Sequence, residues 1–144
     1  MKSLLAAFTL LALPAVAQDH MIMLNIRFDA ATVADLQKRG ELVVVAAMFY
    51  GAPSPGNTLP VDEMGQIYLG TEEFTVWPKD QDFAIGGSLG AAPFDSVLVP
   101  MVNVNVYSAR LSDERNLLDC SFVDGPLLYF AKAPQNIICT LLDG

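Results

Sequence analysis

Basic residues are scarce in this 144-residue sequence, which has eight Lys and Arg against sixteen Asp and Glu and a formal net charge of −8. Proteins that bind nucleic acid need clustered Lys and Arg to neutralise phosphates, and proteins that dock on anionic lipid also need positively charged side chains. We therefore expect no nucleic-acid partner and no docking on anionic membranes. High solubility is the simplest explanation of the acidity.

Histidine occurs only once, at position 20, which leaves few mechanisms that depend on an imidazole base. The string Gly86-Gly87-Ser88-Leu89-Gly90 matches the G-x-S-x-G pattern of a nucleophile elbow. That pattern needs a following helix and a histidine within reach, but Ala91-Ala92-Pro93 leads into a turn. We interpret the segment as a flexible glycine loop, and predict no catalytic residues and no enzymatic activity.

The first seventeen residues have the pattern of an export signal. Lys2 precedes an apolar segment from Leu4 to Leu13, and small residues occupy positions 15 and 17, the two that a signal peptidase inspects. A membrane-spanning helix needs about 20 apolar residues, whereas this run ends before the polar Gln18. We predict cleavage after residue 17 and a soluble mature domain, 18–144, that is periplasmic or secreted. Without Lys2 its formal charge is −9, from seven basic and sixteen acidic residues.

Cysteine occurs only twice, at Cys120 and Cys139. An even number of cysteines in an exported chain favours a disulfide. A bridge that closes a loop of about 20 residues would contribute roughly 3 kcal/mol to stability. Two buried thiols are an alternative, whereas a thiolate metal site lacks Cys-x-x-Cys spacing and a nearby histidine. We predict a structural disulfide.

Apolar residues recur with a period of two along the mature chain, which is typical of strands with one buried face. The alternation is clearest at 22–28 and 102–107. The valine-rich run at 42–50 predicts a central strand covered on both faces. Further strands are expected at 66–69, 73–77, 83–85, 117–123 and 136–142.

Helical patterns are sparse. Thr32 and Asp35 resemble a capping box and Gly40 is a suitable end, so a short helix is predicted at 33–38. Pro126 suits the first position of a second short helix, although 127–130 fits a strand equally well.

The spacing of these elements predicts a mainly β protein. About seven short strands, separated by turn-rich segments at 51–57, 78–82 and 86–93, are typical of a single antiparallel β-sandwich. We expect an immunoglobulin-like or transthyretin-like sandwich with one or two short helices. The disulfide would join the strands at 117–123 and 136–142, and several strand orders fit the same pattern.

The predicted mature N-terminus, Gln18-Asp19-His20, resembles the amino-terminal copper and nickel motif of serum albumins over these three residues. The resemblance implies a square plane of amine, two deprotonated amides and imidazole, which Cu(II) and Ni(II) prefer. The thioethers of Met21 and Met23 suit Cu(I). We expect no cofactor, with copper at this motif as the alternative. Cyclisation of Gln18 would remove the amine ligand, and both methionines also suit the apolar packing of a first strand.

Aromatic and proline residues gather at the ends of predicted strands. They form either a recognition patch, because aromatics dominate interface hot spots, or plugs at the ends of the core, which are more common. The candidate binding-loop residues are Phe49, Tyr50, Pro53, Pro55, Asn57 and Trp77.

Rigid sandwiches commonly carry their contacts on loops, and the loop at 51–60 is the first candidate. We therefore expect a non-catalytic binding or accessory module whose partner is a protein or an envelope component. The alternative is a small copper-handling protein that uses residues 18–21 and 23.

Overall fold

The structure, a computed structural model, describes residues 20–142. The predicted signal segment, 1–17, lies outside the described residues, as do Gln18 and Asp19 of the copper motif.

The described part of the chain contains eight strands, two α-helices and two short 3-10 helices. They are β1 (Ile22–Phe28), α1 (Ala30–Arg39), β2 (Val43–Gly51), β3 (Ile67–Val76), β4 (Gln81–Ile85), η2 (Gly87–Ala91), η3 (Phe94–Ser96), β5 (Met101–Ser108), β6 (Leu118–Cys120), β7 (Val123–Pro126), α2 (Leu127–Phe130) and β8 (Gln135–Leu141).

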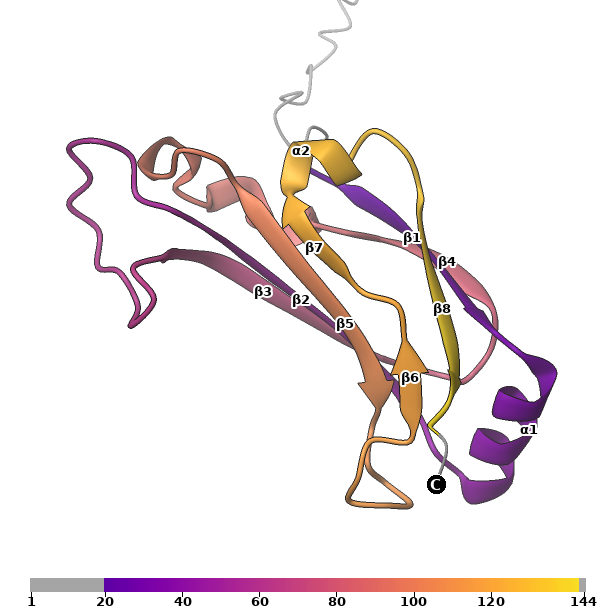
Figure 1. Ribbon diagram of the computed structural model, residues 1–144. Coiled ribbons are helices and arrows are strands. Elements are labelled where there is room, and N and C mark those ends of the chain that lie inside the picture. Colours follow the sequence, from indigo (N-terminus) through magenta and orange to yellow (C-terminus); the bar gives the residue numbers. More distant parts are fainter. Residues whose placement is uncertain (1–19, 143–144) are drawn as a thin grey trace, which may run out of the picture.

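The strands form two four-stranded sheets, in the orders β4-β1-β8-β6 and β3-β2-β5-β7 (Figure 1). The predicted β-sandwich is confirmed, with eight strands in place of about seven. All pairs are antiparallel except β1 with β8, which run parallel. The predicted antiparallel sandwich thus contains one parallel pair, formed by the first and last strands of the chain.

The core lies between the two sheets and follows the period-two pattern. In β1 and β5 the apolar residues at alternate positions are buried, as their sequences predict, except Phe28 at the end of β1, which is partly buried. The buried apolar side chains include Ile22, Leu24, Ile26, Val43, Val45, Phe49, Ile85, Val102, Val104, Ile137 and Cys139. Strand β2 is central in its sheet, but Met48 on its outer face is 46% exposed, so the predicted cover on both faces is incomplete.

Helix α1 begins three residues earlier than predicted. Asp29 is its N-cap, and the Asp29 side chain accepts a hydrogen bond from Thr32 N at 2.7 Å. Thr32 is therefore inside the helix, where it is buried and its Oγ1 accepts from Leu141 N at 3.1 Å. Gly40 ends the helix with a φ of 67°, as expected of a glycine cap.

Two strand predictions differ from the structure. The segments predicted at 66–69 and 73–77 form the single strand β3. It pairs with β2 along its length, with one register shift between Phe49 and Tyr50. The strand predicted at 117–123 is divided, because the chain leaves one sheet after β6 and joins the other at β7. Helix α2 is present as the short second helix, and Pro126 is its N-cap rather than its first residue.

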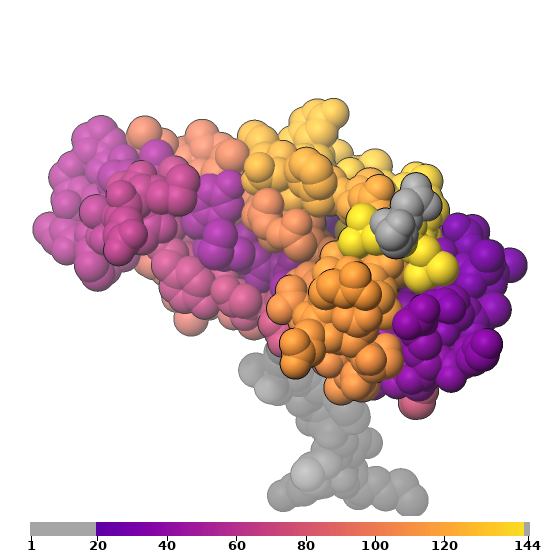
Figure 2. Space-filling view, turned by 60° about the horizontal axis from the view of Figure 1, so that its bottom comes forward, coloured from indigo at the N-terminus to yellow at the C-terminus, as the bar shows by residue number. Residues whose placement is uncertain are grey.

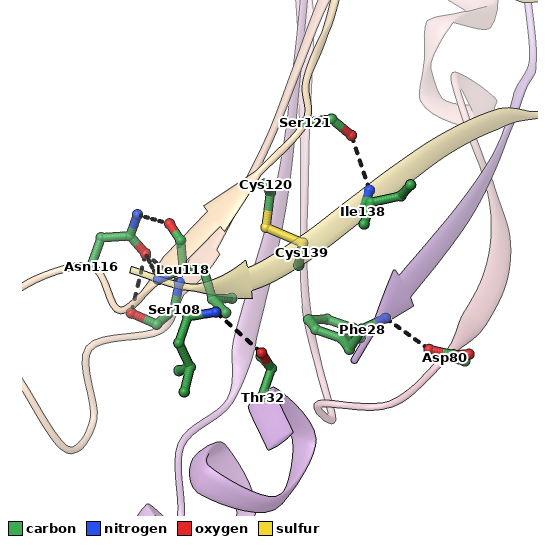
Figure 3. Close-up of a disulfide and its surroundings, with 11 residues drawn as sticks. Phe28, Thr32, Asp80, Ser108, Asn116, Leu118, Cys120, Ser121, Ile138 and Cys139 are labelled. Carbon is green, nitrogen blue, oxygen red and sulfur yellow. Dashed lines mark hydrogen bonds between the residues drawn. A yellow bond between two sulfur atoms is a disulfide. The ribbon is translucent and has the colours of Figure 1, made fainter. Parts of the chain in front are cut away.

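The disulfide between Cys120 and Cys139 is formed and joins the edge strand β6 to β8 (Figure 3). The two cysteines face each other in the antiparallel register, with their Cα atoms 4.1 Å apart. Asn116 Oδ1 accepts from the backbone N–H groups of Ser108 and Leu118 at 3.0 and 3.1 Å, which ties the start of β6 to the end of β5. The bridge thus fastens the sheet edge at which the chain crosses between layers.

None of the helices within residues 20–142 combines the length and the apolar character that crossing a membrane requires.

Candidate binding face

The structure separates the predicted aromatic residues. Phe49 is fully buried in the core, which corresponds to the plug interpretation and removes it from any binding surface. Tyr50 is partly exposed on the outer face of the sheet that contains β2. Trp77 is 69% exposed, so it is not a plug, and it lies beyond the Val43–Val76 pair at the opposite end of the sheet. Trp77 and Tyr50 therefore do not share a site.

The first half of the loop between β2 and β3 is fastened to the segment before β5. Pro53 forms an isolated bridge with Val97, and Ser54 N donates to Ser96 O at 2.9 Å. Pro55 is exposed at the turn that follows. The two predicted prolines thus lie where the loop is held and turned, and the loop forms a lobe at one end of the molecule (Figure 2, magenta).

The second half of the loop is shaped by two side-chain-capped turns. Asn57 Nδ2 donates to Leu59 O at 3.0 Å, and Asn57 Oδ1 accepts from Leu59 N at 2.9 Å. Asp62 Oδ1 accepts from the backbone N–H groups of Met64 and Gln66 at 2.8 and 2.9 Å. These bonds hold an apolar thioether in solvent, since Met64 is 84% exposed.

A hollow of about 360 Å³ lies between this loop and the outer face of the β3-β2-β5-β7 sheet. The register explains its floor, because Tyr50 faces Tyr68 across β2 and β3, and Asn103 of β5 faces both Met48 and Asp124. We call it the outer hollow. Its lining residues are Met48, Tyr50, Asp62, Met64, Gln66, Tyr68, Asn103 and Asp124.

Tyr50 spans the floor of the outer hollow. Its hydroxyl donates a hydrogen bond to Asp124 Oδ1 at 3.0 Å, across the intervening strand β5. Burial raises the pKa of the Tyr50 hydroxyl, and the hydrogen bond to the Asp124 carboxylate raises it further. Tyr50 therefore keeps its proton at neutral pH and fixes the position of the carboxylate.

Sequence reasoning found Tyr50 but missed the other lining residues. Asp62 and Tyr68 follow the predicted loop, and Asn103 and Asp124 belong to strands that are distant in sequence. The alternation of side chains along the strands could have identified two of them. Met48 and Asn103 alternate with buried residues and therefore point to the outer face of the sheet.

The described part of the copper motif is packed against the protein. The His20 imidazole stacks on the Phe94 ring, with centroids 4.0 Å apart and an interplanar angle of 20°. Its Nδ1 is shielded from solvent and has no hydrogen-bond partner. Met21 is partly buried and Met23 is 43% exposed. Within residues 20–142, no group of three or more His, Cys, Asp or Glu side chains is placed to hold a metal ion.

The G-x-S-x-G segment has a structural role that the sequence did not show. It forms η2, and the Glu72 carboxylate accepts from Gly86 N and Ser88 N, both at 2.8 Å, and from Ser88 Oγ at 2.6 Å. The segment is thus anchored to β3, in contrast to the flexible loop expected. A 3-10 helix of five residues replaces the α-helix that follows the serine of a nucleophile elbow.

No family model, curated protein or solved structure matches this chain, so its function has to be inferred from its own geometry.

Proposed function

We propose that this protein is an exported, non-catalytic binding module that holds a partner protein or another envelope component at the outer hollow. The export signal pattern at 1–17 and the disulfide between Cys120 and Cys139 support a periplasmic or secreted location.

The observation that carries the proposal is the exposure of large apolar groups around the outer hollow. Met48, Met64 and Tyr68 are 46, 84 and 60% exposed. Leu59 and Val61, in the loop between β2 and β3, are also exposed. Tyrosine and methionine are enriched at protein interfaces, and apolar side chains concentrated beside a concave site are typical of a binding face. The capped turns hold Leu59 and Met64 in place before a partner arrives, and strands β2 and β3 hold Met48 and Tyr68. This preorganisation lowers the entropy cost of binding.

Site-specific photocrosslinking in the native host tests the location of this face. With p-benzoylphenylalanine in place of Tyr68, we expect a discrete covalent adduct after irradiation. The same group in place of Trp77 is the matched control, because Trp77 is 69% exposed against 60% for Tyr68 but lies at the opposite end of the sheet. Adducts at Trp77 alone, or at neither position, would contradict the proposal.

With the trapped partner purified, Tyr68→Ala should weaken binding about 30-fold, the effect of losing a hot spot of about 2 kcal/mol.

Copper handling is the second candidate, and the unpartnered Nδ1 of His20 favours it. An amino-terminal Cu(II) square plane uses an imidazole nitrogen, so the shielded Nδ1 of His20 would have to become accessible to bind the metal. We expect the processed protein with a free Gln18 amine to bind one Cu(II), and His20→Ala to abolish that binding in a calorimetric titration. Equal titrations for both proteins would eliminate this candidate.

A further inference from the structure

The outer hollow is lined by two carboxylates, beside the side-chain amides of Gln66 and Asn103. Asp62 and Asp124 each use Oδ1 for the internal hydrogen bonds described above and line the hollow with a carboxylate. Gln66 Oε1 is shielded and has no hydrogen-bond partner. The carboxylates of Asp62 and Asp124 use only Oδ1 in their internal hydrogen bonds, so their Oδ2 atoms favour an occupant that brings several N–H groups.

The charge of the outer hollow is negative and uncompensated. Two of its eight lining residues are carboxylates, and none is Lys or Arg. The basic side chains that form ion pairs in the described part of the chain, Arg27, Arg39 and Arg115, all pair with other aspartates. A cationic occupant would therefore supply the charge that the protein itself does not place there.

The walls of the outer hollow suit a flat cation with an aliphatic stem. Tyr50 and Tyr68 supply aromatic rings, and Met48 and Met64 supply flexible thioether chains. A guanidinium group stacks on aromatic faces, is less strongly hydrated than an ammonium group and presents five N–H donors in one plane. Lysine offers a compact, strongly hydrated charge that matches this combination less well.

We infer that the outer hollow receives an arginine side chain from an exposed segment of a partner protein, with apolar neighbours of that arginine packed on the loop at Leu59, Val61 and Met64. This inference rests on the proposed function and specifies the chemistry of the partner.

Short peptides test this chemistry without the natural partner. The probes are acetyl-Leu-Arg-Leu-amide and its lysine and citrulline analogues, titrated to millimolar concentrations against ¹⁵N-labelled protein and followed by amide chemical shifts. Citrulline has nearly the shape of arginine but no charge. We expect shifts at the backbone amides of residues 48–50, 62–68 and 124, and binding of the citrulline peptide at least 10-fold weaker.

Asp124→Asn keeps an acceptor for the Tyr50 hydroxyl and removes the charge, so it should weaken binding of the arginine peptide at least fivefold. Asp119→Asn is the matched control, because Asp119 is an exposed aspartate on the other sheet, and it should leave the affinity unchanged. The amide spectra of both variants report whether the fold is retained.

Equal binding of the arginine and citrulline peptides, or no shifts with any peptide, would overturn the arginine inference. If the Tyr68 crosslink still formed, the outer hollow would remain a binding face for a partner of different chemistry. Loss of the Tyr68 crosslink as well would remove both proposals.

Discussion

Replacing Glu41 by glutamine is expected to lower the free energy of unfolding by about 2–4 kcal/mol at pH 7. The Glu41 side chain is 1% exposed. Its Oε1 accepts from the backbone N–H groups of Leu42 and Leu111, both at 3.1 Å. Its Oε2 accepts from Ser112 N at 2.8 Å and from Ser112 Oγ at 2.6 Å. An amide NH₂ group cannot accept a hydrogen bond. In Glu41→Gln this group replaces either Oε2, where it faces the donors of Ser112, or Oε1, where the N–H groups of Leu42 and Leu111 lose their acceptor.

The effect of Glu41→Gln should depend on pH. Burial raises the pKa of the Glu41 carboxyl, but the hydrogen bonds from Ser112, Leu111 and Leu42 outweigh burial, and the pKa lies below its usual value of 4.5. A pKa lowered by folding contributes stability that is fully present above the unfolded pKa and is lost as pH falls through the folded pKa. The stability difference between wild type and variant should therefore be constant near neutrality and shrink below about pH 4.5.

Urea denaturation of both proteins between neutral pH and about pH 3 measures this difference. Asp113, whose pKa is lowered to about 2 by the hydrogen bonds from Arg115, titrates in both proteins and cancels in the comparison. Glu63→Gln is the control, because Glu63 is exposed, and it should change stability by less than about 0.5 kcal/mol. A Glu41→Gln protein as stable as wild type at pH 7 would contradict this role for Glu41.

The role of Glu41 could not be predicted from the sequence. Glu41 stands between Gly40, which ends α1, and the apolar run of β2, where a charged residue usually faces solvent. Its partners Leu111 and Ser112 lie 70 and 71 residues further along the chain. Only the pairing of β2 with β5 brings the loop after β5 over the carboxylate. The hydrogen bonds from Gly86 and Ser88 to Glu72 could not be predicted either, because they also join residues that are distant in sequence.

The strands were predictable where one face is buried without interruption, as in β1 and β5. The division between β6 and β7 is visible in the burial of the residues and not in the sequence, because Phe122 continues the apolar alternation of Leu118 and Cys120 but is 68% exposed. Leu118 is buried and Cys120 partly buried at even positions, whereas Val123 and Gly125 are buried at odd positions. A period-two pattern that changes phase requires a break in the strand, and here the chain crosses to the other sheet.

The outer hollow was less predictable than the core, because it depends on strand order. Tyr50 and the loop after it were identified by local composition. Asp124 enters the site only because β7 lies next to β5, which lies next to β2. Several orders of the same strands fit the sequence, and an order that does not place β7 beside β5 would put Asp124 elsewhere.

Replacing both Cys120 and Cys139 by alanine is expected to lower the free energy of unfolding by about 3 kcal/mol. The sequence separation of the bridge is 19 residues, and the estimate follows from the entropy that this loop regains in the unfolded chain. Strand β6 has only three residues and pairs with β8 at three positions, so the bridge is a large part of what holds this edge. For a domain of this size, the loss corresponds to a decrease in Tm of about 10 °C.

Thermal unfolding with and without reductant separates the disulfide from the packing of its sulfur atoms. Reductant should lower the Tm of the wild type and leave the double variant unchanged, whereas equal Tm values for oxidised and reduced wild type would contradict a stabilising role. Cys139 is fully buried, so Cys139→Ala also removes core volume, and the double variant should melt slightly below the reduced wild type.

Because an unbridged chain would have a weakened edge where it crosses between sheets, the fold is best maintained in an oxidising compartment. Thiol labelling of protein taken directly from its host should then find both cysteines unreactive until reductant is added, and reactive thiols in the folded native protein would argue against export.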